Sequence, residues 1–442
     1  MLHGDGTGRY ATCMSSSRKS ITDLVLHLHP KRVSAETLRL TLSWGLGGMA
    51  TVLAGMLFIT GVMLLLAYQP TIDQAYESVL VLTREIPFGR WVRNIHHWSA
   101  NLLAAVAVLH MVRVVLTGGF GPGRRLNWVI GLVLLVLLLA ANFTGYLLPW
   151  DQLAYWAVTI CTSMLGYIPL CGHWLETLFR GGDEIGPATL ANFFVLHAAL
   201  LPGLMLILSL WHFWLVRRAG GLVRRKEDGP SDAVPTSPNL LMREAAVGLS
   251  LIAFVLVLAM VADAPLLEQA NPGMSPNPAK APWYFQGFQE LLLHLHPSFA
   301  IFVWPLLAFL ALICLPFARG TALTPGVWFG SHQGRLLAIL AILAGAGLAL
   351  SAILLDGLLL FSTPVNAANT WIARGLFPTV ALIVLMAGAY VVLVRKLGYS
   401  RAEAVMAGVL AVLAVLIVCT VVGVWFRGPE MLLSWPWAQT GA

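Results

Sequence analysis

Four histidines recur at nearly the same spacing in two long apolar stretches. His96 and His110 lie 14 residues apart, and His197 and His212 lie 15 residues apart. In an α-helix, such spacings advance the chain by roughly 21–22 Å and return the side chain to within roughly 40–60° of the same face. Each stretch therefore offers two imidazoles on one face at two depths.

Imidazoles in the apolar interior of a membrane are costly unless they have a partner. Two antiparallel helices would place His96 opposite His197 (the outer pair) and His110 opposite His212 (the inner pair). Facing imidazoles across a helix bundle are an axial ligand set for haem iron. A single histidine of this kind is more often a hydrogen-bonded packing residue. Four at matched depths predict two b-type haems, each held by two histidines.

Glycines repeat the histidine spacing in two further apolar stretches. The 14-residue intervals separate Gly47 from Gly61 and Gly131 from Gly145. Glycine has no Cβ, so a flat haem face could approach the helix closely at these points. The alternative interpretation is ordinary small-residue packing between membrane helices.

Two arginines flank the first histidine stretch. Arg93 lies one turn before His96, and Arg113 lies three residues after His110. Haem propionates need cationic partners near each membrane surface, which both guanidinium groups could supply. The alternative is that both side chains anchor the helix by reaching toward lipid headgroups.

The composition indicates a membrane protein. Of the 442 residues, 58% are hydrophobic and 11% are charged, whereas soluble domains carry about 25% charged residues. About 20 apolar residues cross a bilayer as a helix. Nine stretches meet this requirement: 41–66, 92–116, 127–148, 190–216, 243–262, 298–318, 335–360, 376–394 and 404–426. We expect an all-α polytopic membrane protein, with a four-helix haem-binding bundle followed by about five further transmembrane helices.

The distribution of charge predicts the orientation. With a cytoplasmic N-terminus, 20 of the 27 Lys and Arg residues fall on the inner side, but only eight of the 20 acidic residues do. Cytoplasmic loops carry this excess in membrane proteins. The net charge of +7 therefore indicates contact with anionic lipid headgroups, not with nucleic acid. We expect a bacterial inner-membrane location, with the C-terminus in the periplasm.

The chain divides into four predicted regions. These are an N-terminal cytoplasmic segment, 1–40, with an interfacial helix over 21–40; the di-haem bundle, 41–218; a charged, Pro- and Gly-containing cytoplasmic linker, 219–242; and the C-terminal domain, 243–442. The outer loop after the third stretch should form a flat helix over 150–165. Cys161 and Cys171 in this loop could form a disulfide or remain isolated thiols.

These stretches resemble the cytochrome b family of cytochrome bc and b6f complexes. The resemblance is carried by IHHWSANL, LHMVRVVLTGGF, TGYLLPWDQLAYWAV and the 15-residue histidine interval, and it runs from about residue 35 to 220. The b6 branch is the most similar. In the C-terminal half, which is similar to an extended subunit IV, NPAKAPWYFQGFQELL looks like the Pro-Glu-Trp-Tyr loop of the family.

The resemblance implies a quinol–cytochrome c reductase. Quinol, either menaquinol or ubiquinol, would be oxidised at an outer site formed by Pro282, Trp283 and Tyr284, with Tyr284 holding its hydroxyl. Quinone would be reduced at an inner site near Arg217. The implied partners are a Rieske-type iron–sulfur protein, a c-type cytochrome and a second copy of the chain, because such complexes are homodimers.

Two positions depart from the family pattern. The b6 branch carries a covalently attached third haem on a cysteine where this chain has Gly45, so we expect no covalent haem. The glutamate of the Pro-Glu-Trp-Tyr loop is replaced by Pro282, which cannot accept a proton. Glu290 could take over the proton-accepting role, although a surface or ion-paired carboxylate is the plainer interpretation.

Two other functions compete with this one. A di-haem anchor of a non-bifurcating quinone-linked dehydrogenase or reductase would use the same histidines, but not the PWDQ and APWY loops. A transporter with structural histidines would need broken helices and polar sites at the bilayer midplane. The histidines at two depths argue against a transporter.

Overall fold

The computed structural model describes residues 31–225, 233–359 and 370–438. Within these ranges, nine helical segments are long and apolar enough to cross a membrane, as predicted. They are α3 (Leu46–Leu65), α5 (Gly89–Leu116), α6 (Arg125–Leu147), α9 (Pro187–Val195) continued by η2 (Leu196–Leu200) and α10 (Leu201–Arg218), α11 (Thr236–Val261), η3 (Phe299–Val303) with α13 (Trp304–Cys314) and η4 (Leu315–Phe317), α14 (His332–Leu359), η6 (Ile372–Leu376) with α16 (Phe377–Val391) and η7 (Val392–Lys396), and α17 (Arg401–Trp425).

Shorter elements connect these spans. They are β1 (Arg32–Ser34), η1 (Ala35–Leu38), α2 (Leu40–Ser43), α4 (Ala75–Arg84), α7 (Gln152–Leu165), α8 (Gly172–Arg180), β2 (Ala233–Pro235), α12 (Trp283–His294), η8 (Pro429–Met431) and η9 (Pro436–Ala438). The outer-loop helix predicted from sequence corresponds to α7.

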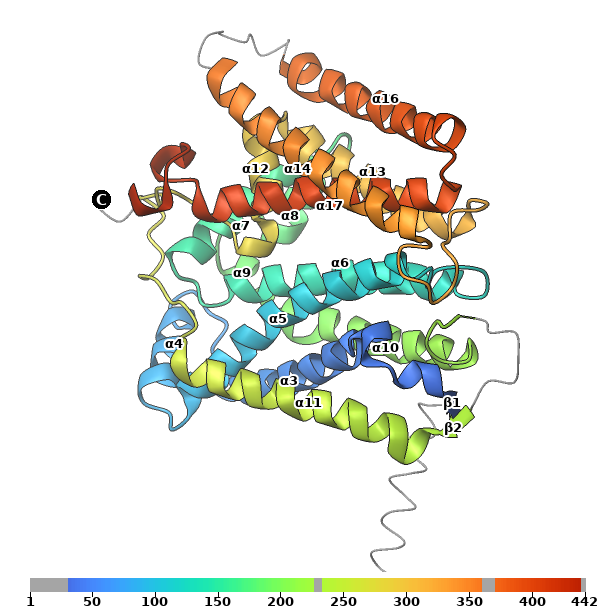
Figure 1. Cartoon of the computed structure of the whole chain (residues 1–442). Helices are drawn as coiled ribbons and strands as arrows, with labels where there is room; N and C mark the ends of the chain where they lie inside the picture. The colour runs from blue at the N-terminus through green and yellow to red at the C-terminus, as the bar shows by residue number, and fades with distance from the viewer. Residues whose placement is uncertain (1–30, 226–232, 360–369, 439–442) are drawn as a thin grey trace, which may run out of the picture.

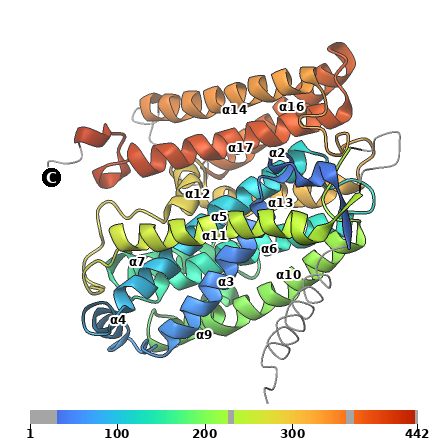
Figure 2. The same ribbon diagram turned by 60° about the horizontal axis from the view of Figure 1, so that its bottom comes forward.

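The spans form two groups of helices (Figure 1). The histidine-bearing α5 and α10 lie with α3 and α6, and α11 packs along α3 and α5 through a core that includes Leu53 and Val255. Helices α13, α14, α16 and α17 make up the second group (Figures 1 and 2), and α16 lies at its edge in Figure 1. A second core, which includes Phe120 and Met406, joins α5 and α6 to α17.

The first and fifth spans differ from the predicted ranges. The first begins at Leu46 instead of 41, because Trp44 and Gly45 adopt left-handed conformations, with φ of 54° and 64°, and interrupt the helix. The fifth begins at Thr236, inside the predicted linker, so the linker is shorter than expected. Residues 226–232 of that linker lie outside the described ranges.

The predicted interfacial helix over 21–40 is wrong where it can be compared. Residues 31–40 form β1 and the short 3₁₀ turn η1, while 21–30 lie outside the described residues. β1 pairs antiparallel with β2, and Val33 is buried in this pairing. The pairing holds the start of the chain to the start of α11, a long-range contact that local helical periodicity cannot reveal.

Three spans contain a widened helical turn in their N-terminal half, and the span of α16 has another, η7, at its end. In η2, the Leu201 N–H bonds to the carbonyl of Leu196, five residues earlier; η3 and η6 have the same pattern. Each of these three N-terminal turns ends two residues before a proline, namely Pro202, Pro305 or Pro378. Proline lacks an N–H and interrupts the regular i→i−4 ladder, and the turn absorbs one extra residue.

Candidate functional site: paired histidines and the outer loops

The structure brings the two outer histidines face to face. The ring centroids of His96, on α5, and His197, in η2, lie 6.2 Å apart with an angle of 74° between the rings. Gly61 and Gly145 flank this pair from α3 and α6. The four-helix arrangement predicted from the spacing is therefore present at this level.

Hydrogen bonds fix the outer imidazoles through the nitrogen that points away from the partner ring. The Thr60 hydroxyl donates to the Met56 carbonyl at 2.7 Å and accepts from His96 Nδ1 at 2.9 Å. His197 Nδ1 donates to the Ala141 carbonyl at 2.9 Å. With Nδ1 protonated in both rings, each Nε2 keeps a free lone pair, as a metal-ligating histidine requires.

The inner histidines also come together, but with fewer supports. His110 and His212 lie close enough to interact electrostatically. Gly47 lies against His110, and Gly131 lies against His212: a Cβ at either glycine would be 3.6 Å and 3.5 Å from the ring. His212 Nδ1 is buried, and its nearest partner, the backbone of Asn127, does not reach it with full hydrogen-bond geometry.

All four predicted glycines lie against the four histidine rings. The closest approach is at Gly145, where a Cβ would lie 2.9 Å from both Nδ1 and Nε2 of His197 and nearer still to Cε1. At Gly61 the corresponding distance to His96 Cε1 is 3.4 Å. At the outer level, buried imidazoles with free Nε2 atoms face each other between helix surfaces that lack side chains. The inner imidazoles lie against glycines in the same way, so these residues fit two bis-histidine haems.

The two predicted propionate-binding arginines differ in what they contact. Arg93 donates to the carbonyls of Ala264 at 2.9 Å and Pro265 at 2.6 Å, so two of its nitrogens hold the loop after α11. Arg113 is buried; its Nε donates to the Leu42 carbonyl at 3.0 Å. One terminal nitrogen of Arg113 is buried without a partner in the described structure, which leaves a cationic donor open near the inner pair.

The PWDQ motif clamps the outer loop to the loop before α12. Asp151 caps α7 by accepting from Ala154 N at 2.9 Å, and it also accepts from Leu267 N at 3.0 Å. The side-chain oxygen of Gln152 accepts from Asn271 N at 2.6 Å. These bonds explain how residues far apart in sequence form one outer site.

The predicted quinone-binding residues at the start of α12 contact the histidine helices. Trp283 Nε1 donates to Asn101 Oδ1 on α5 at 2.7 Å, and the Tyr284 hydroxyl donates to the Asn142 carbonyl on α6 at 3.4 Å. Burial raises the pKa of the Tyr284 phenol, so it stays protonated. Pro282 directly precedes these two residues.

The structure does not bring every predicted site residue to this place. Glu290 lies on the face of α12 that turns toward α17, where it contacts Arg427 and His294, whereas the Tyr284 hydroxyl meets α6. Arg217 lies in the last turn of α10, near the inner end of the bundle.

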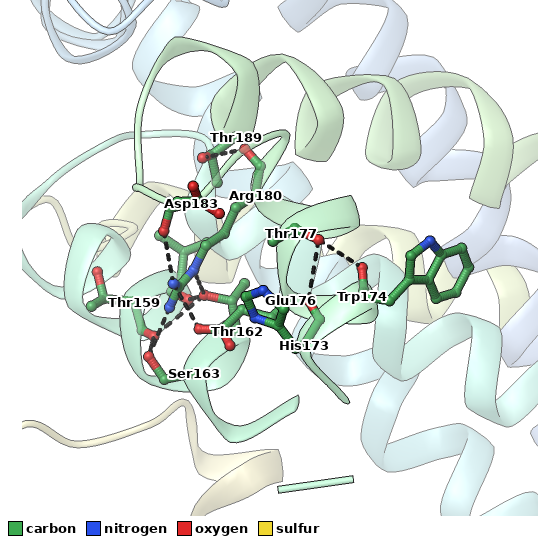
Figure 3. A network of polar contacts seen from close by, with 11 residues as sticks. Thr159, Thr162, Ser163, His173, Trp174, Glu176, Thr177, Arg180, Asp183 and Thr189 are labelled. Carbon is green, nitrogen blue, oxygen red and sulfur yellow. Dashed lines mark hydrogen bonds and ion pairs between the residues drawn. The ribbon is translucent and has the colours of Figure 1, made fainter. Parts of the chain in front are cut away.

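A network around Arg180 holds the outer loop in shape (Figure 3). Its guanidinium donates to Thr162 Oγ1 at 2.9 Å and Ser163 Oγ at 2.7 Å on α7, and it pairs with Glu176 on α8 at 2.7 Å. The Thr189 hydroxyl on α9 donates to the Arg180 carbonyl at 2.7 Å. One arginine therefore ties three helices, while Cys161 and Cys171 are free thiols in this structure.

Sequence reasoning missed several residues of the site. Thr60 lies one residue before Gly61, and only the fold shows that its hydroxyl bonds to His96 Nδ1. Tyr146 lies close enough to Tyr284 for the two phenols to interact, and it belongs to the TGYLLPWDQ stretch. Pro202, five residues after His197, was the available signal for the widened turn.

Comparison with known proteins agrees with this architecture. The fold and the paired histidines define a multi-pass membrane protein with a histidine-bearing four-helix bundle. The family model described as cytochrome b/b6/petB matches residues 32–220. Cytochrome b6 of Prochlorococcus marinus strain MIT 9515 is 42% identical over 175 residues, which are 40% of this chain and 80% of that protein; strain NATL1A gives 41% over the same length and shares. The chain belongs to the cytochrome b family.

A solved structure extends the likeness of fold to the C-terminal half. The structure described as a hyperthermophilic respiratory Complex III covers 92% of this chain and 96% of its own, with a TM-score of 0.66 and 23% identity. The helices beyond the di-histidine bundle therefore share an overall arrangement with that protein. The predicted family and the predicted all-α membrane fold are both confirmed.

Proposed function

We propose that this chain is the cytochrome b subunit of a quinol–cytochrome c oxidoreductase of the bc or b6f type. His96 and His197 would hold one haem b, and His110 and His212 would hold the other. The observation that carries the proposal is the outer pair, whose rings face each other at 6.2 Å with both Nδ1 atoms already hydrogen-bonded elsewhere. When bound, the haems supply electron transfer across a bilayer core about 30 Å thick.

The residues around the histidines would orient and shield these groups. Thr60 and the Ala141 carbonyl fix the direction of the two outer imidazoles. The four glycines leave room against the rings. The open donor of Arg113 suits a propionate at the inner level. Arg93 combines its predicted propionate role with holding the loop after α11.

The outer quinol site would lie between the loops 149–165 and 281–290. Tyr284 would hold a quinol hydroxyl, and Trp283 and Pro282 would line the site at the start of α12. Pro282 cannot accept a proton, so protons would leave along the neighbouring face of the same helix, which carries Glu290. Tyr284 would thus bind the quinol, and Glu290 would belong to the proton path.

The inner quinone site would lie near Arg217, at the end of α10. No covalent haem is proposed there. Gly45 has no thiol, has a φ of 64°, and has Val247 Cγ1 only 3.3 Å from where a Cβ would be. A cysteine in that conformation would be strained, and α11 already packs against the position.

The proposed surroundings follow from the same assignment. A Rieske-type protein and a c-type cytochrome would take electrons on the outer side, in a homodimeric complex of a bacterial inner membrane. The N-terminus would be cytoplasmic and the C-terminus periplasmic. The excess of Lys and Arg in the predicted inner loops supports this orientation.

Haem analysis of the intact purified complex tests the proposal. We expect two haems b per chain, no haem retained after acid–acetone extraction, and reduction of both by added quinol. Fewer than two haems in the correctly folded complex, or no reduction by menaquinol or ubiquinol, would contradict it.

Pro282 favours a second candidate, a di-haem anchor of a non-bifurcating quinone-linked complex. A pulse of oxidant to the quinol-supplied, inner-site-inhibited complex separates the two. If the two electrons of quinol are split, the oxidant transiently increases haem b reduction. In a non-bifurcating anchor the oxidant only oxidises the haems, and a Rieske signal is absent.

A further inference from the structure

A polar stripe runs along the face of α12 that turns away from the histidine bundle. Gln286, Glu290 and His294 follow each other at intervals of four residues, so their side chains stack on one helix face. The Gln286 amide nitrogen donates to the carbonyl of Ala281, and its oxygen is buried without a partner in the described residues. The stripe therefore starts at the loop that contains Pro282.

Glu290 is completely buried and is held by a permanent cation. Arg427 donates to its two oxygens at 3.0 Å and 2.5 Å. Burial opposes ionisation, but the bonds from His294 and Arg427 outweigh it and hold the pKa of Glu290 below its usual range. Cys419 on α17 also lies near this carboxylate. Glu290 is thus a fixed negative charge, and its pair with Arg427 is close to neutral.

His294 stands between two carboxylates, one on each ring nitrogen. Its Nε2 lies 3.1 Å from Glu290 Oε1, and its Nδ1 is bonded to the Asp356 carboxylate. Arg427 also approaches Nε2, at 3.4 Å. Although burial opposes its charge, the two carboxylates raise the pKa of His294. An imidazole bonded at both nitrogens can gain a proton on one side and release one on the other.

The exposed fraction of the side chain increases from Glu290 through His294 to Asp356. The side chain of Glu290 is 0% exposed, that of His294 is 18% exposed, and that of Asp356 is 24% exposed. Asp356 lies in the last turn of α14, and Arg427 lies two residues after the end of α17. The chain of groups thus leads from the buried carboxylate of Glu290 toward the more exposed end of α14.

We propose that His294 is the proton-relay group of the outer quinol site and that Asp356 is its exit to the surface. This inference rests on the proposed quinol oxidation, which must release protons where Pro282 cannot take them. Glu290, paired with Arg427, positions the imidazole and stabilises its charged form. His294 and Asp356 both lie outside the 281–284 loop, in which the family resemblance places a proton acceptor.

The transfer balances as one proton in and one proton out. In the resting form, Nδ1–H of His294 is donated to Asp356, and the lone pair of Nε2 faces the Arg427 guanidinium at 3.4 Å. A proton from the quinol hydroxyl, carried past the open Gln286 oxygen by bound waters along the stripe, binds Nε2 and forms the imidazolium, which Glu290 stabilises. The Nδ1 proton then leaves to Asp356 and the aqueous surface. No electron moves in this step.

The test measures quinol-dependent haem b reduction in the intact complex across pH 5–9. In the wild type, the rate should rise with pH through the raised His294 pKa, because only the neutral ring accepts a proton. His294→Gln should slow reduction at least about tenfold and abolish that rise. In His294→Gly, added imidazole should restore the rate, which a purely structural role would not permit. Asp356→Asn, which leaves the Glu290–Arg427 pair intact, should also slow it.

His173→Gln on the outer helix α8 is the matched control, since this histidine is exposed and lies outside the stripe. Its rate and pH profile should equal those of the wild type. Haem content and the reduced spectrum report whether each variant is folded. A wild-type pH profile in both His294→Gln and Asp356→Asn, or slowing without imidazole rescue, would overturn the relay. No quinol-dependent reduction in the wild type would instead overturn the proposed function, and the relay with it.

Discussion

The outer and inner histidine pairs lie between the same four helices but differ in how firmly the protein holds them. At the outer level, Thr60 and the Ala141 carbonyl fix both Nδ1 atoms. At the inner level, His212 Nδ1 has only a weaker interaction with the backbone of Asn127, without full hydrogen-bond geometry. Outer-shell hydrogen bonds orient metal-ligating histidines and increase their basicity. The outer site is therefore preorganised by the chain itself, whereas the inner site depends more on the group it binds.

The glycines show the same contrast. At the outer level a Cβ would meet His96 at 3.4 Å, and at Gly145 it would overlap the His197 ring. At the inner level, Gly47 and Gly131 leave 3.6 Å and 3.5 Å, which is ordinary van der Waals contact. The closest packing thus coincides with the best-supported histidines.

The largest expected effect comes from removing one ligand at each level. His197→Ala should leave one haem per chain, and His212→Ala should also leave one, the other of the two. Truncation removes an axial ligand that no neighbouring side chain replaces. Haem quantification with redox titration of the remaining haem measures this, and the two variants should retain haems of different potential. Two haems in either variant would refute the pairing.

A smaller effect, different at the outer and inner histidine pairs, is expected from adding one methyl group to a glycine beside each pair. Gly145→Ala should displace the His197 ring and lose the outer haem, at a cost of about 1–3 kcal/mol in protein stability. Gly131→Ala, the matched inner change, should retain both haems because its Cβ only touches His212. Haem content and thermal unfolding of the two variants compare the levels. Equal haem loss in the two variants would contradict the proposed difference between the outer and inner pairs.

The smallest effect should follow from removing one supporting hydrogen bond. Thr60→Val deletes the acceptor of His96 Nδ1 and should weaken outer-haem retention by about 10–100-fold, with the inner haem unchanged. Thr60→Ser keeps the hydroxyl and should behave as the wild type. The rate of haem loss to an apo-globin acceptor gives the measurement. Equal loss from both haems would show that the outer level is not specially held.

The histidine intervals also illustrate what local sequence can predict. The 14-residue interval of α5 and the 15-residue interval of the fourth span appeared to differ by one residue. The widened turn η2, which contains His197, absorbs that residue and brings the second interval close to the geometry of the first. The pairing of the histidines could be predicted because it needs only helical periodicity. The widened turn η2 could not, because it depends on how the helix rearranges its hydrogen bonds before Pro202.

Long-range contacts were beyond the sequence for a different reason. The strand pair of residues 32–34 with 233–235 replaced a predicted helix, since its stability comes from partners about 200 residues apart. The tie between Glu290 and Arg427 spans 137 residues. No local pattern shows that a carboxylate on α12 meets an arginine beyond α17, so Glu290 could be selected as a proton group but not placed.

Hydropathy and helical periodicity were enough to predict the membrane class, the nine spans and the pairing of the four histidines, because these are properties of single segments. The family followed from the resemblance of a few short motifs. The tertiary structure alone decided which nitrogen of each imidazole is engaged, how closely the glycines approach the rings, and where Glu290, His294 and Asp356 meet. Those features arise between segments, where packing fixes distances that no single helix specifies.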